Sequence, residues 1–215
     1  MSTVKYYDWS YHQARTRPNK VAVKEVSTGR ETTYGQLEER SCRLASWLQN
    51  KGVKKGDRVA ILIHNCTEVF ELEFACAKIG AVELPLNWRL TKPELEYILN
   101  DSSPEVLIYG SNFSDTAKAL TKDCSIKNSL EIDDEDQNNE YEQALKENID
   151  FDVVETTHDD LIMLMYTSGT TGHPKGAMIT HEMQFYNIVN LAGSSRVTDK
   201  TVQLIVLPLF HTGGM

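Results

Sequence analysis

Short apolar runs recur along the chain and alternate with stretches that have the spacing of amphipathic helices. The runs span residues 59–63, 81–86, 105–109 and 161–165. A strand that is apolar on both faces is typical of a parallel sheet buried between two layers of helices. Parallel strands need crossover connections, which are almost always right-handed. The alternation therefore predicts an α/β fold, a layered β/α block around a mainly parallel sheet.

Capping residues mark the starts of the helices between these runs. In a capping box, a Ser or Thr side chain binds the backbone N–H of the third helical residue, whose Glu or Gln side chain binds back. Thr33 with Gln36 and Thr91 with Glu94 are predicted to cap helices in this way, and Asn65 with Glu68 can cap the helix between them. Glycines follow two of the predicted helix ends, at Gly52 and Gly80, where a left-handed residue commonly ends a helix.

The stretch of residues 131–142 breaks this pattern. It reads EIDDEDQNNEYE, so that carboxylates crowd it and apolar residues nearly vanish. A calcium loop needs ligands in a fixed order with a turn glycine, which this stretch lacks, and we interpret it as a solvated loop. It divides the chain into a first β/α block, residues 1–130, and a segment of residues 143–215. A length of 215 residues with 40% hydrophobic content suffices for one large domain or one and a half ordinary ones.

Directly after the last apolar run, residues 166–176 read YTSGTTGHPKG. Glycines let backbone N–H groups approach an anion, hydroxyls add donors, and a lysine supplies positive charge, so this composition predicts a phosphate-binding loop. An ordinary flexible surface loop is the alternative. The run is not a Walker A loop, because Lys175 precedes a glycine and β-prone residues, which predicts strand, loop, strand. The residues assigned to phosphate binding are Thr167, Ser168, Gly169, Thr170, Thr171, Gly172, Lys175 and Gly176.

These eleven residues resemble a motif of the adenylate-forming superfamily, which includes acyl- and aryl-CoA synthetases, adenylation domains of peptide synthetases, and luciferases. Residues 207–214, LPLFHTGG, resemble the next block of the family at the expected distance. More diffuse similarity is found upstream, in residues 33–37, 56–60, 78–82 and 85–90. These upstream segments look like the acyl-CoA synthetase branch. Family members are more than twice as long, so we expect this chain to be the N-terminal portion of an acyl-CoA synthetase-like fold, a fragment.

The resemblance implies an ATP-dependent acid:CoA ligase, with ATP, Mg²⁺ and CoA as cofactor or co-substrates. A carboxylic acid would attack the α-phosphate of ATP to form an acyl-adenylate, and CoA would then take the acyl group. The protein mainly positions reactants and neutralises charge, and Lys175 is the residue assigned to that charge. Thr167 aligns with a hydroxyl that helps carry Mg²⁺, while a plain capping hydroxyl remains the alternative. Further groups that relatives place downstream are missing, so the fragment alone is expected to be inactive.

His211 is the second residue assigned to catalysis, because the resembled position contacts the acyl substrate. It follows a predicted strand at residues 202–207 and precedes two glycines. Adenylation domains of peptide synthetases usually place an aspartate there to meet an amino group, so His211 disfavours an amino acid and favours a fatty or aryl acid. Two other functions remain as alternatives: adenylation for transfer to a carrier-protein thiol, and a non-catalytic phosphate- or acyl-binding module.

Other candidate residues are interpreted as structural. His173 lies at a variable position of the motif and is predicted to face solvent. His181 follows Thr180 at a predicted helix start, where a structural role and a ligand contact both remain open. Trp88 and Arg89 could form a base-stacking platform and a phosphate clamp, but packing and an ion pair are the favoured interpretation.

The overall composition restricts partners and location. The formal charge of −9 argues against nucleic acid or an anionic membrane surface as the main partner. The four cysteines lack C-x-x-C spacing and are predicted to be free thiols. No apolar signal core starts the chain and no run approaches membrane-spanning length, which predicts a cytoplasmic protein without a transmembrane segment. The expected partners are a small carboxylic acid, ATP, CoA and the missing C-terminal part of the chain itself; the oligomeric state stays open.

Overall fold

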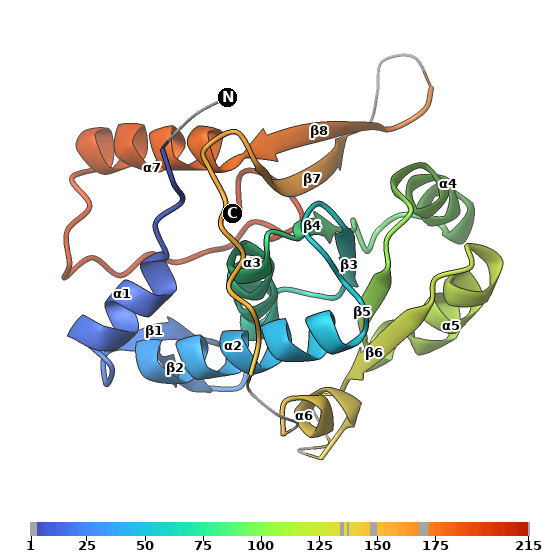
Figure 1. The fold of residues 1–215 in the computed structure, drawn as a ribbon, viewed down its shortest axis with the longest axis horizontal. Coiled ribbons are helices and arrows are strands. Elements are labelled where there is room, and N and C mark those ends of the chain that lie inside the picture. The colour runs from blue at the N-terminus through green and yellow to red at the C-terminus, as the bar shows by residue number, and fades with distance from the viewer. Residues whose placement is uncertain (1–3, 134–135, 137, 147–149, 168–171, 215) are drawn as a thin grey trace.

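A six-stranded sheet with the order β6-β5-β3-β4-β7-β8 forms the centre of the molecule (Figure 1). The computed structural model describes residues 4–133, 136, 138–146, 150–167 and 172–214. The strands are β3 (Arg58–Leu62), β4 (Val82–Pro85), β5 (Val106–Gly110), β6 (Asn128–Ile132), β7 (Leu161–Thr167) and β8 (Lys175–Thr180). All neighbours are parallel except β7 and β8, which form an antiparallel hairpin. The predicted α/β class with a mainly parallel sheet is confirmed.

Helices cover both faces of this sheet (Figure 1). In chain order they are α1 (Trp9–Thr16), α2 (Tyr34–Asn50), α3 (Thr67–Ile79), α4 (Lys92–Ser102), the short 3-10 helix η1 (Ser111–Phe113), α5 (Ser114–Asp123), α6 (Glu140–Ala144) and α7 (His181–Ser195). A ribbon of β1 (Val21–Lys24) and β2 (Glu31–Thr33) precedes α2.

Two apolar layers explain why the central strands are mostly apolar. Along β3, Val59 and Ile61 pack against α2, α3 and α6, whereas Ala60 and Leu62 pack against α4 and α5. Successive side chains of a strand point to opposite faces, so each face of this strand is buried. Across the described ranges, no helix is both long and apolar enough to cross a lipid bilayer.

Local capping signals are confirmed for two of the three predicted helix starts. Thr33 and Gln36 form the capping box of α2, and Thr91 and Glu94 form that of α4. Gly80 ends α3 in the left-handed region, with a φ of 69°. In each of these confirmed cases the partners lie within one helical turn and no distant residue takes the place of either one.

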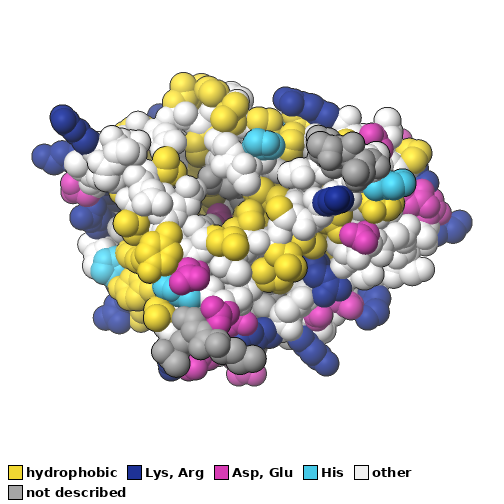
Figure 2. Space-filling view, turned by 90° about the horizontal axis from the view of Figure 1, so that it is seen from above, with side chains coloured by type: hydrophobic (Ala, Val, Ile, Leu, Met, Phe, Trp, Pro, Cys, Tyr) yellow, Lys and Arg dark blue, Asp and Glu magenta, His cyan; other side chains and the backbone are white. Residues whose placement is uncertain are grey.

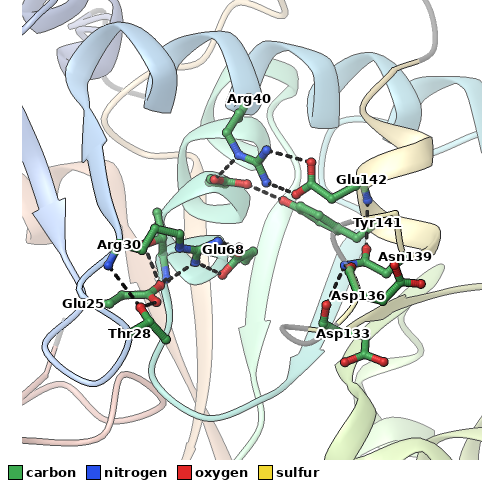
Figure 3. Close-up of polar contacts among 12 residues, drawn as sticks. Glu25, Thr28, Arg30, Arg40, Glu68, Asp133, Asp136, Asn139, Tyr141 and Glu142 are labelled. Atoms are coloured by element: carbon green, nitrogen blue, oxygen red, sulfur yellow. Dashed lines mark hydrogen bonds and ion pairs between the residues drawn. The ribbon is translucent and has the colours of Figure 1, made fainter.

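The predicted cap of α3 by Asn65 and Glu68 is wrong. The helix starts after Cys66, which makes no side-chain cap, and the Glu25 carboxylate instead accepts hydrogen bonds from the backbone N–H and the hydroxyl of Thr67 at 2.9 and 2.8 Å. Glu68 pairs with Arg30 at 2.7 Å (Figure 3). A carboxylate from the turn between β1 and β2 thus caps the helix, a contact that no local pattern indicates.

The acidic stretch of residues 131–142 is not a loop along its whole length. Its first two residues end β6 and its last three begin α6. Tyr141 is buried and its hydroxyl donates to Glu71 at 2.7 Å, while Arg40 binds both Glu71 and Glu142, at 2.5 and 2.6 Å (Figure 3). A basic residue of α2 and a buried carboxylate of α3 therefore fix the end of this stretch. The domain boundary predicted within it stays a prediction.

The predicted strand at residues 202–207 is also wrong. These residues have an extended run of apolar side chains, but no strand in the described part of the chain pairs with them, and Val202 is 94% exposed. A strand requires a partner, which composition alone does not supply.

Figure 2 looks onto the side that carries α7 and β8, and shows apolar side chains spread over that face. The exposed large apolar side chains of α7 are Met183, Tyr186, Ile188, Val189 and Leu191.

All four cysteines are free thiols, as predicted. Burial raises the pKa of the Cys42 thiol to about 12 and also raises the pKa values of Cys66, Cys76 and Cys124. A thiol that resists deprotonation is a poor nucleophile. The cysteines therefore have no feature of a catalytic group.

His181, the first residue of α7, is buried without a hydrogen-bond partner on either ring nitrogen among the described residues. Its ring lies 4.4 Å from the ring of Tyr6, centroid to centroid, and Thr180 caps the helix by accepting from the N–H of Met183. The predicted helix start is confirmed. Burial lowers the pKa of His181 to about 4. The structural role therefore fits this residue better than a ligand contact.

We expect His181 to make the protein less stable in mild acid. The unfolded chain would take up a proton near the ordinary pKa of 6.5, whereas the folded chain would not do so until about pH 4. Above pH 6.5 the ring is neutral in both states, and its burial does not reduce stability through proton uptake. As the pH falls from 7.5 to 5, the free energy of unfolding should decrease by about 2 kcal/mol. Urea unfolding of wild type and of His181→Phe at both pH values isolates this contribution. Equal losses in the two proteins would show that His181 does not cause it.

Candidate functional site

The carboxyl ends of the parallel strands define one edge of the sheet, and the predicted functional segments follow them. His64 comes after β3, Trp88 after β4, Phe113 after β5, and Thr167 ends β7. The connection after β3 leads to α3 on one face, whereas that after the neighbouring β4 leads to α4 on the other. Such a switch point at the carboxyl edge is where open α/β sheets usually bind ligands.

The strand, loop, strand arrangement predicted for residues 166–176 is confirmed by the hairpin of β7 and β8. Thr167 at the end of β7 lies opposite Lys175 at the start of β8. Both are exposed, and none of the described carboxylates forms an ion pair with Lys175. The lysine charge is therefore open to solvent at the mouth of the hairpin. The assigned residues Ser168, Gly169, Thr170 and Thr171 lie outside the described residues.

The described glycines of the motif have distinct steric roles. Gly172 adopts a φ of 100°, which side chains rarely tolerate. At Gly176, a Cβ atom would lie 2.8 Å from the Leu164 side chain and 3.3 Å from the ring of Tyr166. The missing side chain at position 176 thus lets the Tyr166 ring lie against the backbone of β8.

His211 lies in a compact turn over the carboxyl edge. Asn65 holds this turn, because its side chain donates to the carbonyl of Leu207 at 2.8 Å and accepts from the N–H of Leu209 at 2.9 Å. Within the turn, the N–H of Gly213 donates to Nδ1 of His211 at 3.2 Å. This bond requires an unprotonated Nδ1, so the ring proton resides on Nε2, where it can serve as a donor. The ring is exposed.

Gly214 is sterically required in this turn. A Cβ atom there would lie 2.3 Å from the carbonyl oxygen of Pro208, closer than any real contact. The sequence shows two glycines shortly after His211 but gives no reason for either of them. The geometry adds a conformational reason for one of them.

An aromatic cluster lies between the strand ends and the His211 turn. The Trp88 ring lies 4.7 Å from His64 and 6.1 Å from Phe210, and the Arg89 guanidinium lies over Trp88 at 4.8 Å and over Phe210 at 5.8 Å. Packing was the favoured interpretation for Trp88 and agrees with these contacts. The ion pair suggested for Arg89 is not among the ion pairs of the described residues, and cation–π contacts take its place.

The structure brings some predicted residues together and leaves others apart. Thr167, Lys175 and Gly176 lie on the paired strands of one hairpin, and Gly172 lies in the connection between these strands. In the described part of the molecule, no hydrogen bond, ion pair or ring contact joins Lys175 to His211. The solvent-facing position predicted for His173 is confirmed, although its ring also stacks on Tyr97 at 4.9 Å.

Sequence reasoning missed the contacts that α4 makes with the hairpin. The Tyr166 hydroxyl donates to Asp101 at 2.5 Å, and Tyr97 stacks on His173. Neither α4 residue belongs to a recognisable motif. A helical spacing of four residues is the one signal that would have placed Tyr97 and Asp101 on a common face.

The donor set at the hairpin fits a magnesium ion that arrives with a nucleotide better than a resident metal. In the described residues no group of three or more His, Cys, Asp or Glu side chains could hold a metal ion. Thr167 offers one exposed hydroxyl next to Lys175. Mg²⁺ commonly takes one or two protein oxygens and completes its shell with phosphates and water.

Comparison with known proteins decides the family. The family model for AMP-binding enzymes matches residues 10–215. The chain belongs to the AMP-binding enzyme family. A feruloyl-CoA synthase of an Amycolatopsis species is 38% identical to it over 207 residues, 96% of this chain. The long-chain-fatty-acid–CoA ligase FadD13 of Mycobacterium tuberculosis is 35% identical over 99% of this chain.

Solved structures of AMP-binding enzymes agree with the fold. ATP-bound MatB from Rhodopseudomonas palustris superimposes with a TM-score of 0.83 and 29% identity, over 95% of this chain and 41% of that one. The chain spans 40% and 42% of the lengths of the feruloyl-CoA synthase and FadD13. It therefore corresponds to the N-terminal part of an AMP-binding enzyme.

Proposed function

We propose that the protein to which this chain belongs is an ATP-dependent, AMP-forming acid:CoA ligase, acting in the cytoplasm on a fatty or aryl carboxylic acid. One observation carries the proposal: at the carboxyl edge of the sheet, the β7–β8 hairpin presents a lysine that has no ion-pair partner among the described residues, within a chain of the AMP-binding family. Relatives named as feruloyl-CoA synthase and long-chain-fatty-acid–CoA ligase support the reaction class.

The described residues suit an adenylation followed by thioester formation. A carboxylate oxygen would bond to the α-phosphorus of ATP as the bond to pyrophosphate breaks, and the thiol of CoA would then displace AMP from the acyl carbon. Lys175 and the loop donors would hold the β- and γ-phosphates and stabilise the charge on departing pyrophosphate. Thr167 would lend its hydroxyl to Mg²⁺, which supplies further charge neutralisation when bound with ATP.

His211 would meet the carboxylate end of the acid. Its neutral ring can donate from Nε2 to a carboxylate oxygen, but it offers no ion pair to a substrate ammonium group. We expect fatty or aryl acids to be activated well ahead of amino acids, and His211→Ala to weaken the apparent affinity for the acid more than that for ATP. Steady-state kinetics with each substrate varied in turn measure the two losses. Equal losses, or a preference for an amino acid in wild type, would refute the assignment.

The 215-residue chain alone is predicted to lack activity. Relatives are more than twice its length, so groups that complete the site elsewhere in such enzymes are not expected within these residues. Purified polypeptide 1–215 should show no acid-dependent ATP–pyrophosphate exchange and no thioester synthesis. Robust turnover by this polypeptide would show that the catalytic groups lie within it.

The acceptor distinguishes the proposed ligase from an enzyme that loads a carrier protein. The native polypeptide, isolated at the size at which cells produce it, would be given an aryl or fatty acid, ATP, and either CoA or a phosphopantetheinylated carrier protein. Acyl-CoA as the favoured product supports the proposal. Exclusive acylation of the carrier, or no acyl transfer despite ATP binding, would contradict it and favour one of the alternatives.

A further inference from the structure

The phosphate loop has a neighbour outside its own hairpin, the helix α4. Two side chains of this helix contact the two ends of the loop. On the β7 side, the hydroxyl of Tyr166 donates to the carboxylate of Asp101 at 2.5 Å. On the β8 side, the rings of Tyr97 and His173 stack with centroids 4.9 Å apart and planes inclined by 23°.

The helix is suited to act as a fixed support. Its capping box fixes the first turn, and Leu95, Ile98 and Leu99 are buried in the layer between α4, α5 and the sheet. Lys92 ties it further to Asp123 of α5, at 2.5 Å. Tyr97 and Asp101 are four residues apart, so they project from the same face of the helix. Both contacts to the hairpin therefore originate from one rigid surface.

The hairpin is arranged to receive these contacts. Tyr166 directly precedes Thr167, and the absence of a side chain at Gly176 lets the Tyr166 ring lie across β8. Burial, followed by the bond to Asp101, raises the pKa of Tyr166, so the phenol remains a donor at neutral pH. The bond thus connects α4 to the residue next to the mouth of the hairpin.

We propose that Asp101 and Tyr97 are positioning residues that hold the two ends of the phosphate loop in register for ATP. The inference rests on the proposed function, since it assigns the loop to the phosphates of ATP. Neither residue contacts the nucleotide in this account; each acts through its partner on the hairpin. Loss of these contacts would loosen the mouth of the hairpin, formed by Thr167 and Lys175. A misplaced donor there lowers the affinity for the phosphates of ATP. Recognition of the acid at the His211 turn would be unaffected.

The test compares Asp101→Ala, Tyr166→Phe and the double variant in the full-length enzyme. We expect each single change to raise KM for ATP roughly 3- to 10-fold and to change KM for the acid less than about 2-fold, because an exposed hydrogen bond to a carboxylate is modest in strength. The double variant should be no worse than either single variant, since both remove the same bond. Asp101→Glu, which keeps the carboxylate, should recover part of the loss. Tyr97→Leu should show the same selective effect on ATP.

Asp115→Ala is a matched control, because this exposed aspartate lies on α5 and, in the described part of the chain, forms no hydrogen bond or ion pair with α4 or the hairpin. It should leave both KM values unchanged. An additive double variant, or equal changes in the two KM values, would overturn the proposal.

Hydrogen exchange provides a readout that does not need activity. Backbone amides in residues 165–167 and 172–177 should exchange at least about 3-fold faster in Asp101→Ala than in wild type, while urea unfolding stays the same. If wild type lacks acid-dependent exchange of pyrophosphate, the proposed function fails, yet the hydrogen-exchange comparison still decides whether α4 supports the hairpin. Identical exchange in these peptides would refute that support even in an active ligase.

Discussion

Replacing Lys175 by alanine is expected to slow adenylation by the full-length enzyme roughly 10- to 1000-fold, the range found when one transition-state donor is removed. The ammonium group stands exposed at the start of β8, and no described carboxylate neutralises it. It would balance charge that grows as pyrophosphate departs, so its loss should raise the barrier more than it weakens ground-state binding. Acid-dependent ATP–pyrophosphate exchange measures the effect. Unchanged exchange in a correctly folded variant would show that Lys175 does not act in adenylation.

Two further variants separate the role of this charge from charge in general. Lys175→Arg should restore the activity only in part, because a planar guanidinium does not reproduce a compact ammonium group. Lys127→Ala is the control. Lys127 directly precedes β6, at the opposite edge of the sheet from the hairpin, and forms an exposed pair with Glu105 at 2.7 Å. Its replacement should leave exchange unchanged.

Replacing Arg40 by alanine is expected to lower the free energy of unfolding by about 3–5 kcal/mol, the cost of leaving a buried charge without its partner. Arg40 binds Glu71 and Glu142, and the Glu71 side chain is 1% exposed (Figure 3). Burial opposes ionisation of Glu71 and raises the pKa of its carboxyl group. The nearby Arg40 guanidinium lowers this pKa but does not cancel the effect of burial. Without Arg40, Glu71 must either stay ionised in an apolar layer or take up a proton. Urea unfolding measures the loss.

The double variant Arg40→Met with Glu71→Gln tests the physical reason. It removes both buried charges, so it should lose less stability than Arg40→Ala alone. The hydroxyl of Tyr141 can still donate to the amide oxygen that replaces the Glu71 carboxylate. If the double variant were as unstable as the single one, the loss would come from packing of the Arg40 side chain and not from an uncompensated charge.

The predictions that were confirmed in this protein depended on residues within one turn or one strand. The capping boxes at Thr33 and Thr91 involve partners three residues away, and the left-handed Gly80 needs no distant contact. The apolar strands follow from burial on both faces, which the sequence displays directly. The hairpin follows from the residues after Lys175, which favour a strand over the helix of a Walker A loop.

Predictions failed where a distant residue supplied the partner. Asn65 looked like a helix cap, yet its side chain binds the chain more than 140 positions later, at Leu207 and Leu209. Glu25 caps α3 from a turn 42 positions upstream. In the site, the hydrogen bond from Tyr166 to Asp101 joins residues that are 65 positions apart, and no sequence motif links them. Sequence patterns of a single chain report local preference, and such pairs become visible only once the fold brings them together.

Acid-dependent exchange of pyrophosphate into ATP is the most direct test of the central claim, that this chain provides the phosphate site of an AMP-forming acid:CoA ligase. The native full-length protein would be incubated with ATP, Mg²⁺, labelled pyrophosphate and a panel of aryl, fatty and amino acids, with Lys175→Ala and Lys127→Ala alongside. The account predicts exchange that requires an aryl or fatty acid, falls at least about 10-fold in Lys175→Ala and is unchanged in Lys127→Ala. Exchange that is absent with every acid, or equal in Lys175→Ala and wild type, would contradict it.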